Sequence, residues 1–195
     1  MPVKVLALSG SLRKASLNTA LLRAAARLAP PGLAVTVYSG LGDLPLFNPD
    51  LETALPADVA RFHRHVAEAD ALLIASPEYA HGVTGTIKNA LDWLVGFEGF
   101  AGIPVAAWNA SPRAHHADDA LRETLRTMAA VVVEEASVSV PLLGSHLDEN
   151  GMVESAEIAV AIGDALAALH AAVLALRPQR NTVYPAASIS VPTKG

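Results

Sequence analysis

The sequence contains no cysteine, which excludes disulfide bonds, thiolate nucleophiles and cysteine-ligated metals. Charged residues are also sparse, at 17%, and the 14 Lys and Arg are outnumbered by 19 Asp and Glu, for a net charge of -5. The basic residues are scattered, as in the pairs Arg23/Arg27 and Arg61/Arg64. Because nucleic-acid binding needs clustered cations to neutralise phosphates, we expect no nucleic-acid partner.

No charged leader precedes the first apolar segment, and no run of about 18 apolar residues stands out. We therefore expect neither a signal peptide nor a membrane span, and a cytoplasmic location. Hydrophobic residues make up 52% of the 195 positions. A chain of this length and composition can bury roughly 70% of its unfolded surface around one core.

Apolar runs of strand length alternate with segments of helical period. The predicted strands are residues 3–8, 34–38, 71–75, 104–108 and 131–133, with 137–140 as a candidate continuation. The predicted helices are residues 18–29, 58–69, 85–95 and 119–129, followed by a long one whose apolar positions run from 158 to 176. This alternation predicts a parallel sheet covered by helices on both faces. Five strands best fit a flavodoxin-like three-layer α/β sandwich with strand order 2-1-3-4-5.

We find no internal repeat and no domain boundary within residues 1–177. Two loops are long, 40–55 and 141–154, and the segment 178–195 lacks a helical pattern. We therefore divide the chain into one domain, 1–177, and a C-terminal tail, 178–195.

The loop after the first strand is rich in hydroxyl groups and carries two cations. Ligands of such sheets bind beyond the carboxyl ends of the strands, where a helix N-terminus offers free N–H groups. Side chains of the loop that can bind a phosphate are Ser11, Arg13, Ser16, Asn18 and Thr19. A plain helix cap by Ser16 or Asn18 is the alternative interpretation, but a cap needs only one such residue. Neither GxGxxG nor GxxxxGK[ST] follows this strand.

The loops after the third and fourth strands are suited to a flat ligand. Pro77 stiffens the first of them, Tyr79 offers an aromatic face, and Gly82 and Gly85 allow a close approach of the backbone. Ser111 and the amides that follow it could reach the same ligand from the other side. An ordinary strand-to-helix loop with a buried tyrosine is the alternative for the first of these loops.

Two motifs resemble those of NAD(P)H-dependent FMN reductases, a family that includes quinone, azo-dye and chromate reductases. The pattern GSxRxxSxN is matched in full at residues 10–18, and PEY with GxxKNAxDW is matched at 77–79 and 85–93. The sequence departs from the family at Ala80, where Asn is usual, and at His115 and His116, where many members have two glycines.

The resemblance implies a flavodoxin-like domain that binds FMN and accepts electrons from NADPH or NADH. It also implies a small-molecule electron acceptor, such as a quinone or free flavin, and a homodimer or homotetramer. The FMN-binding residues would be Ser11, Arg13, Ser16, Asn18, Thr19, Pro77, Glu78, Tyr79, Ala80, His81 and Gly82. To these we add Ser111 and Arg113 from the loop after the fourth strand. No protein nucleophile or general base is required, because the flavin carries the chemistry.

Three alternatives remain open from the sequence. His81, His115 and His116 could converge on a metal, although adjacent histidines seldom bind one ion, so we expect no metal site. A flavodoxin-type electron carrier without nicotinamide activity is a second alternative; such proteins usually have a shorter, less basic phosphate loop. A flavin-free member of the fold is the third.

Overall fold

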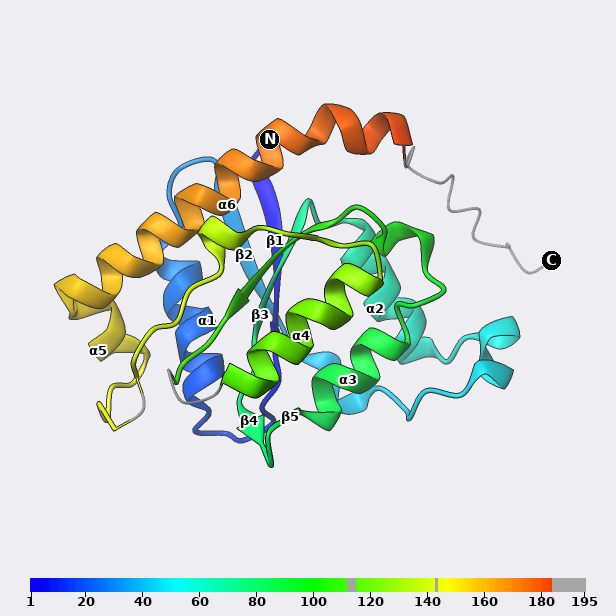
Figure 1. The fold of residues 1–195 in the computed structure, drawn as a ribbon, viewed down its shortest axis with the longest axis horizontal. Helices are drawn as coiled ribbons and strands as arrows, with labels where there is room; N and C mark the ends of the chain where they lie inside the picture. The colour runs from blue at the N-terminus through cyan, green and yellow to red at the C-terminus, as the bar shows by residue number, and fades with distance from the viewer. Residues whose placement is uncertain (112–114, 143, 184–195) are drawn as a thin grey trace.

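The computed structural model describes residues 1–111, 115–142 and 144–183, and its centre is a five-stranded parallel sheet (Figure 1). The strand order is β2-β1-β3-β6-β7. The strands are β1 (Val3–Ser9), β2 (Leu33–Tyr38), β3 (Ala71–Ala75), β6 (Pro104–Trp108) and β7 (Val131–Val132). Since β6 and β7 are the fourth and fifth strands of this sheet along the chain, the predicted flavodoxin-like order 2-1-3-4-5 is confirmed.

Helices cover both faces of the sheet, and each face has its own hydrophobic cluster. Alternate residues of β1 supply the two clusters: Val5 and Ala7 pack on one side, Leu6 and Leu8 on the other. The first cluster includes residues of α1 (Leu17–Leu28), α5 (Glu149–Glu154) and α6 (Ala156–Val183). The second includes residues of α2 (Ala57–Ala67), α3 (Gly85–Asp92) and α4 (His115–Thr127). The three-layer sandwich is thus confirmed.

The three central strands end side by side, and this determines where the site lies. Ser9 at the end of β1 is in register with Ala75 at the end of β3, and Ala75 with Trp108 at the end of β6. The loops that leave these strands therefore start next to one another at one edge of the sheet.

Several elements differ from the sequence-based expectation. Residues 78–83, expected as a loop, form an antiparallel hairpin of β4 (Glu78–Tyr79) and β5 (Gly82–Val83). The described part of α4 already begins at His115, not at 119, because the Glu78 carboxylate accepts a hydrogen bond from the backbone N–H of Ala117 at this end of the helix. Helix α3 ends at Asp92, although the apolar pattern continues to the buried Leu94.

The fifth strand is interrupted. After β7, a 3-10 turn spans Glu134–Ala136, and the chain then rejoins the sheet through a parallel bridge between Asn109 and Ser139. The Asn109 N–H donates to the Val138 carbonyl and the Val140 N–H donates to the Asn109 carbonyl. The candidate continuation at 137–140 is therefore present as a bridge next to the end of β6.

Helix α6 corrects one expectation. It runs to Val183, so the expected lack of helix is wrong for 178–183.

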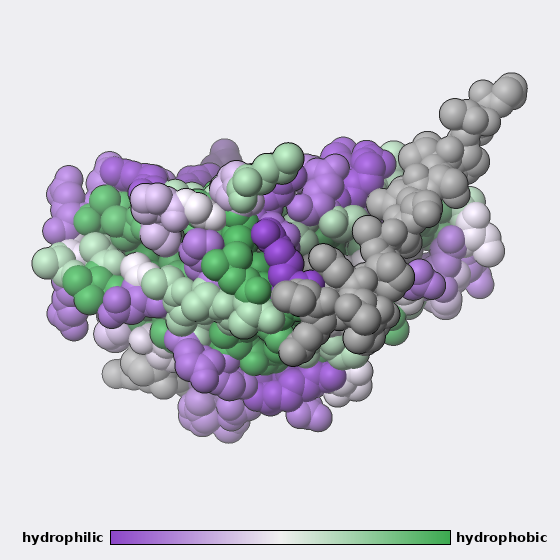
Figure 2. All heavy atoms as spheres, turned by 90° about the horizontal axis from the view of Figure 1, so that it is seen from above, coloured by the Kyte–Doolittle hydropathy of each residue, from purple (hydrophilic) through white to green (hydrophobic). Residues whose placement is uncertain are grey.

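The segment Ala156–Arg177 of α6 has a mean hydropathy of 2.0 and is, by length and composition alone, apolar enough to cross a membrane. Such a segment was not expected from the sequence. Its inner side packs on the sheet, with Ile162, Leu166 and Leu169 in the core. On the outside, Val160 and Leu174 are exposed. Seen from above, this face of the molecule carries a largely apolar band (Figure 2).

Candidate functional site

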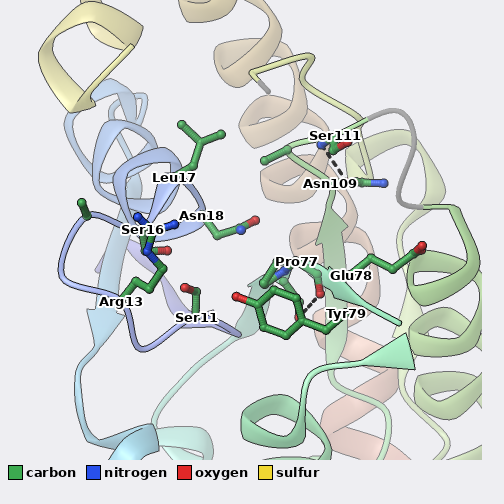
Figure 3. Close-up of a pocket in the computed structure, with 13 residues that line it drawn as sticks. Ser11, Arg13, Ser16, Leu17, Asn18, Pro77, Glu78, Tyr79, Asn109 and Ser111 are labelled. Carbon is green, nitrogen blue, oxygen red and sulfur yellow. Dashed lines mark hydrogen bonds between the residues drawn. The ribbon is translucent and has the colours of Figure 1, made fainter. Parts of the chain in front are cut away.

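A cavity of about 310 Å³ lies where the loops after β1, β3 and β6 meet (Figure 3). Its size falls at the lower end of the range of small-molecule pockets. The lining residues come from all three loops: Ser11, Arg13, Ala15, Ser16, Leu17, Asn18, Ser76, Pro77, Glu78, Tyr79, Asn109, Ala110 and Ser111. Loops far apart in the sequence thus form one concave site at the carboxyl edge of the sheet.

Gly10 lets the first two loops approach each other closely. Its N–H donates to the Ala75 carbonyl over 2.8 Å. A Cβ atom at this position would lie only 2.2 Å from Oγ of Ser76 and 2.9 Å from Oγ1 of Thr84. Only glycine fits between these side chains, so the loop after β1 rests directly on the loop after β3.

The start of α1 forms one wall of the cavity. Ser16 is the N-cap of this helix, and its hydroxyl oxygen accepts a hydrogen bond from the Thr19 N–H over 3.1 Å. The capping role considered from the sequence is therefore real for Ser16. The Ser16 hydroxyl proton still remains available to a ligand, because capping uses the oxygen as an acceptor.

Asn18 is buried with an unmatched polar atom. Only 6% of the residue is exposed, and its Oδ1 has no hydrogen-bond partner. An unpaired amide at such a position costs free energy, of the order of 1–3 kcal/mol, unless a ligand pairs with it. Asn18 lines the cavity, and its amide also carries two N–H donors that a ligand could use.

The hairpin β4–β5 forms the opposite wall. Tyr79 is 58% exposed, and its ring reaches toward the first loop, whereas the Glu78 side chain turns away from that loop (Figure 3). Ala80 and His81 form the two-residue turn with φ of 51° and 61°. Two positive φ values are the signature of a type I′ turn, which favours Asn-Gly. The chain here accepts two residues that are strained in this conformation.

Glu78 joins the hairpin to α4. Its Oε2 accepts from the Ala117 N–H over 2.8 Å, and its Oε1 lies 3.1 Å from Nδ1 of His81. These contacts stabilise the carboxylate, and the backbone N–H of Ala117, followed by His81, lowers the pKa of Glu78 below its ordinary value. Two further histidines lie next to His81. The ring centroids of His81 and His116 are 4.5 Å apart, and those of His116 and His115 are 4.1 Å apart.

Comparison with models of protein families shows which family the chain belongs to. The model described as NADPH-dependent FMN reductase matches residues 3–143. The chain belongs to the NADPH-dependent FMN reductase family. The matched region begins at β1 and contains all three loops of the cavity.

Individual relatives agree with this membership of the FMN reductase family. An NAD(P)H-dependent FMN reductase of Pseudomonas aeruginosa is 41% identical over 56% of this chain and 60% of its own length. An NADPH:quinone oxidoreductase of Arabidopsis thaliana is 49% identical over 47% of this chain and 48% of its own length. The matches thus span 60% and 48% of the lengths of these two relatives. The structure of a flavoenzyme NAD(P)H:(acceptor) oxidoreductase from Paracoccus denitrificans superimposes with a TM-score of 0.76 at 29% identity, covering 89% of this chain and 98% of that one.

The structure brings most of the predicted FMN-binding residues of this family member together. Those in the cavity lining are Ser11, Arg13, Ser16, Asn18, Pro77, Glu78, Tyr79 and Ser111. Four others lie outside the lining: Thr19, whose hydroxyl bonds to Ser9 over 2.7 Å, and Ala80, His81 and Gly82 at the hairpin tip. Arg113 lies outside the described residues.

Other lining residues were not singled out from the sequence. Asn109 is the most informative, because its Oδ1 accepts from the Ser111 N–H over 2.9 Å and so shapes the third loop. Its position directly after an apolar strand could have suggested it. Among the described residues, no group of three or more His, Asp or Glu side chains is arranged to hold a metal ion.

Proposed function

We propose that this member of the FMN reductase family is an NAD(P)H-dependent oxidoreductase that holds FMN in the cavity. Electrons from NADPH or NADH would pass through the flavin to a small acceptor such as a quinone or free flavin. Bound FMN would supply the redox chemistry, by accepting two electrons as hydride and releasing them to an acceptor. The chain would supply binding, orientation and an open face for the two substrates.

The observation that carries this proposal is the buried Asn18 at the start of α1, which lines the cavity and whose Oδ1 has no hydrogen-bond partner. A phosphate placed there would meet the N–H groups of the helix terminus and its partial positive charge. It would also meet the hydroxyls of Ser11 and Ser16 and the guanidinium of Arg13, all of which line the cavity. Within the described residues, Arg13 has no ion-pair partner, so its charge is available to an anion.

The rest of the cavity suits the flavin ring. Pro77 and Tyr79 offer flat apolar surfaces, and Ser111 with its neighbouring backbone lies on the opposite side of the opening. Backbone N–H groups near the pyrimidine part of the ring would favour its anionic reduced form. These features support FMN over a ligand without an aromatic ring.

The first test is retention of FMN in an Arg13→Ala variant. We expect the purified wild-type protein to take up FMN with the absorbance of an oxidised flavin, and the variant to retain several-fold less. Removing one charge-assisted hydrogen bond to phosphate costs about 1.5–3 kcal/mol, a tenfold or larger loss of affinity. Absorbance after gel filtration measures the flavin content.

The matched control is Arg23→Ala, which removes a cation from the exposed side of α1. It should keep the wild-type flavin content. Equal flavin in the Arg13 variant and the wild type would contradict the phosphate site. Anaerobic bleaching of the bound flavin by NADPH or NADH then separates a reductase from an electron carrier, which would not be reduced by either nucleotide.

We also propose that the protein works as a homodimer or homotetramer in the cytoplasm, with no membrane or nucleic-acid partner. The exposed Val160 and Leu174 on α6 support self-association, because apolar side chains on one helix face are often covered by another subunit. Sedimentation equilibrium tests the oligomeric state, and a single species of monomer mass would refute self-association.

A further inference from the structure

Reduction of a quinone needs a proton that hydride transfer does not deliver. A quinone takes up two electrons and two protons to become a hydroquinone, and one hydride equivalent brings both electrons and one proton. We propose, on the basis of the function proposed above, that His81 donates the second proton to the acceptor's oxygen at the mouth of the cavity.

His81 stands at the tip of the hairpin that forms one cavity wall. The two residues of β4, Glu78 and Tyr79, line the cavity, and His81 follows two positions later in the turn. Its side chain is 75% exposed, so it can meet both a bound substrate and bulk water. Its Nδ1 lies 3.1 Å from Oε1 of Glu78, a residue of the cavity lining, so the imidazole stands next to the cavity wall.

Glu78 orients the imidazole of His81. The Glu78 side chain is only 11% exposed and is held by the Ala117 N–H, so its carboxylate is a fixed acceptor. Its contact with Nδ1 of His81 at 3.1 Å assigns the proton of the neutral ring to Nδ1. Nε2 is then the atom that gains a proton from water and gives it away. Glu78 is accordingly a positioning residue.

The neighbouring histidines extend this arrangement along the rim. His116 packs edge-on against His81, and His115 lies against His116. Both are exposed, and within the described residues neither ring has a hydrogen-bond partner. The other charged groups of this helix end are Asp118, which is paired with Arg122 over 2.8 Å, and Asp119. Exposed imidazoles exchange protons with water and can resupply His81.

The step balances without any further reactant. The hydride would leave its bond in the reduced cofactor and add to the quinone ring system, and the electron pair of one C=O π bond would move onto the oxygen. The Nε2–H bond of the His81 imidazolium breaks, its electron pair stays on nitrogen, and the proton forms the O–H bond. The neutral imidazole then regains a proton from solvent.

The test compares a quinone with ferricyanide, which accepts one electron and no proton. We expect His81→Gly to lower the ratio of quinone to ferricyanide turnover at least tenfold, within the range of general acid catalysis. Glycine suits the positive φ at this position, so the turn should fold. Imidazole added to the buffer should restore part of the ratio. His65→Gln, an exposed site on α2, is the control and should keep the wild-type ratio.

A second readout does not depend on turnover. Nuclear magnetic resonance of the imidazole nitrogens should show the Nδ1–H tautomer for His81 in the wild-type protein and its loss in Glu78→Gln. An unchanged turnover ratio in His81→Gly, or a ratio that imidazole does not raise, overturns the proposal, as does an Nε2–H tautomer. A wild-type protein that reduces neither acceptor with NADPH or NADH refutes the proposed function itself.

Discussion

At the scale of single residues, Glu78 connects the hairpin, the helix α4 and the cavity. Its carboxylate accepts hydrogen bonds on both oxygens, from the backbone of Ala117 and from His81. These contacts favour the ionised form and depress its pKa. A carboxyl whose pKa is lower in the folded than in the unfolded protein binds fewer protons when folded. Its contribution to stability is therefore complete above the ordinary value, 4.5, and lost as the pH falls through the folded value.

We expect Glu78→Gln to flatten the pH dependence of stability below about pH 4.5, because the amide does not titrate. Urea unfolding at a series of pH values measures the free energy of unfolding. The control, Glu123→Gln, changes an exposed carboxyl on α4 and should keep the wild-type slope. A Glu78 variant with the wild-type slope in acid would show that these contacts do not hold the carboxylate.

The residues of the site could be predicted where they lie in the loops that leave the central strands. Ser11 and Ser111 come two or three positions after buried strand ends and line the cavity. Thr19 lies farther along, on the first turn of α1, where its hydroxyl bonds to Ser9. The position of His81 in space could not be predicted, because it is set by a hairpin with two residues per strand. Such a hairpin is too short to show a periodic pattern in the sequence.

At the scale of elements, the end of α4 shows a conformation that its sequence does not favour. The Ala130 N–H donates to the Leu125 carbonyl and the Ala129 N–H donates to the Arg126 carbonyl, which is the Schellman motif. Ala129 has φ of 61°, at the position where glycine is usual. An alanine there is strained by about 1 kcal/mol.

We expect Ala129→Gly to raise the free energy of unfolding by about 0.5–1 kcal/mol, since the relief of strain exceeds the added flexibility of the unfolded chain. Thermal and urea unfolding measure this change. The matched control is Ala120→Gly, at an exposed position in the middle of the same helix. This substitution should lower the free energy of unfolding by about 1 kcal/mol. A loss of stability in both variants would contradict the strained cap.

Periodicity predicted the long elements well and the short ones poorly. The strands Ala71–Ala75 and Pro104–Trp108 were bounded correctly, because both are continuous apolar runs that are buried on both faces. The hairpin β4–β5 and the six-residue α5 were missed, since each is shorter than the window that reveals a period. Helix α6 continues to Val183, although the sequence from residue 178 onward has no helical pattern.

At the scale of the whole molecule, the sheet couples the two hydrophobic clusters to each other and to the site. Leu73 of β3 belongs to one cluster and Leu72 and Ile74 to the other, and β3 itself leads into the loop with Pro77. Neither cluster can open without loosening the strand that it shares with the other. We therefore expect unfolding in one transition, so that a ligand bound at the loops stabilises the entire domain.

FMN should accordingly raise the melting temperature of the whole protein. At a concentration of one hundred times its Kd, a ligand that binds only the folded state adds about 2.7 kcal/mol. For a chain of this size that corresponds to a shift of roughly 5–11 °C. Riboflavin is the matched ligand, because it has the same ring without the phosphate, and its shift at equal concentration should be much smaller. Equal shifts with both would mean that the start of α1 does not hold the phosphate, and two separate transitions would mean that the two faces of the sheet unfold independently.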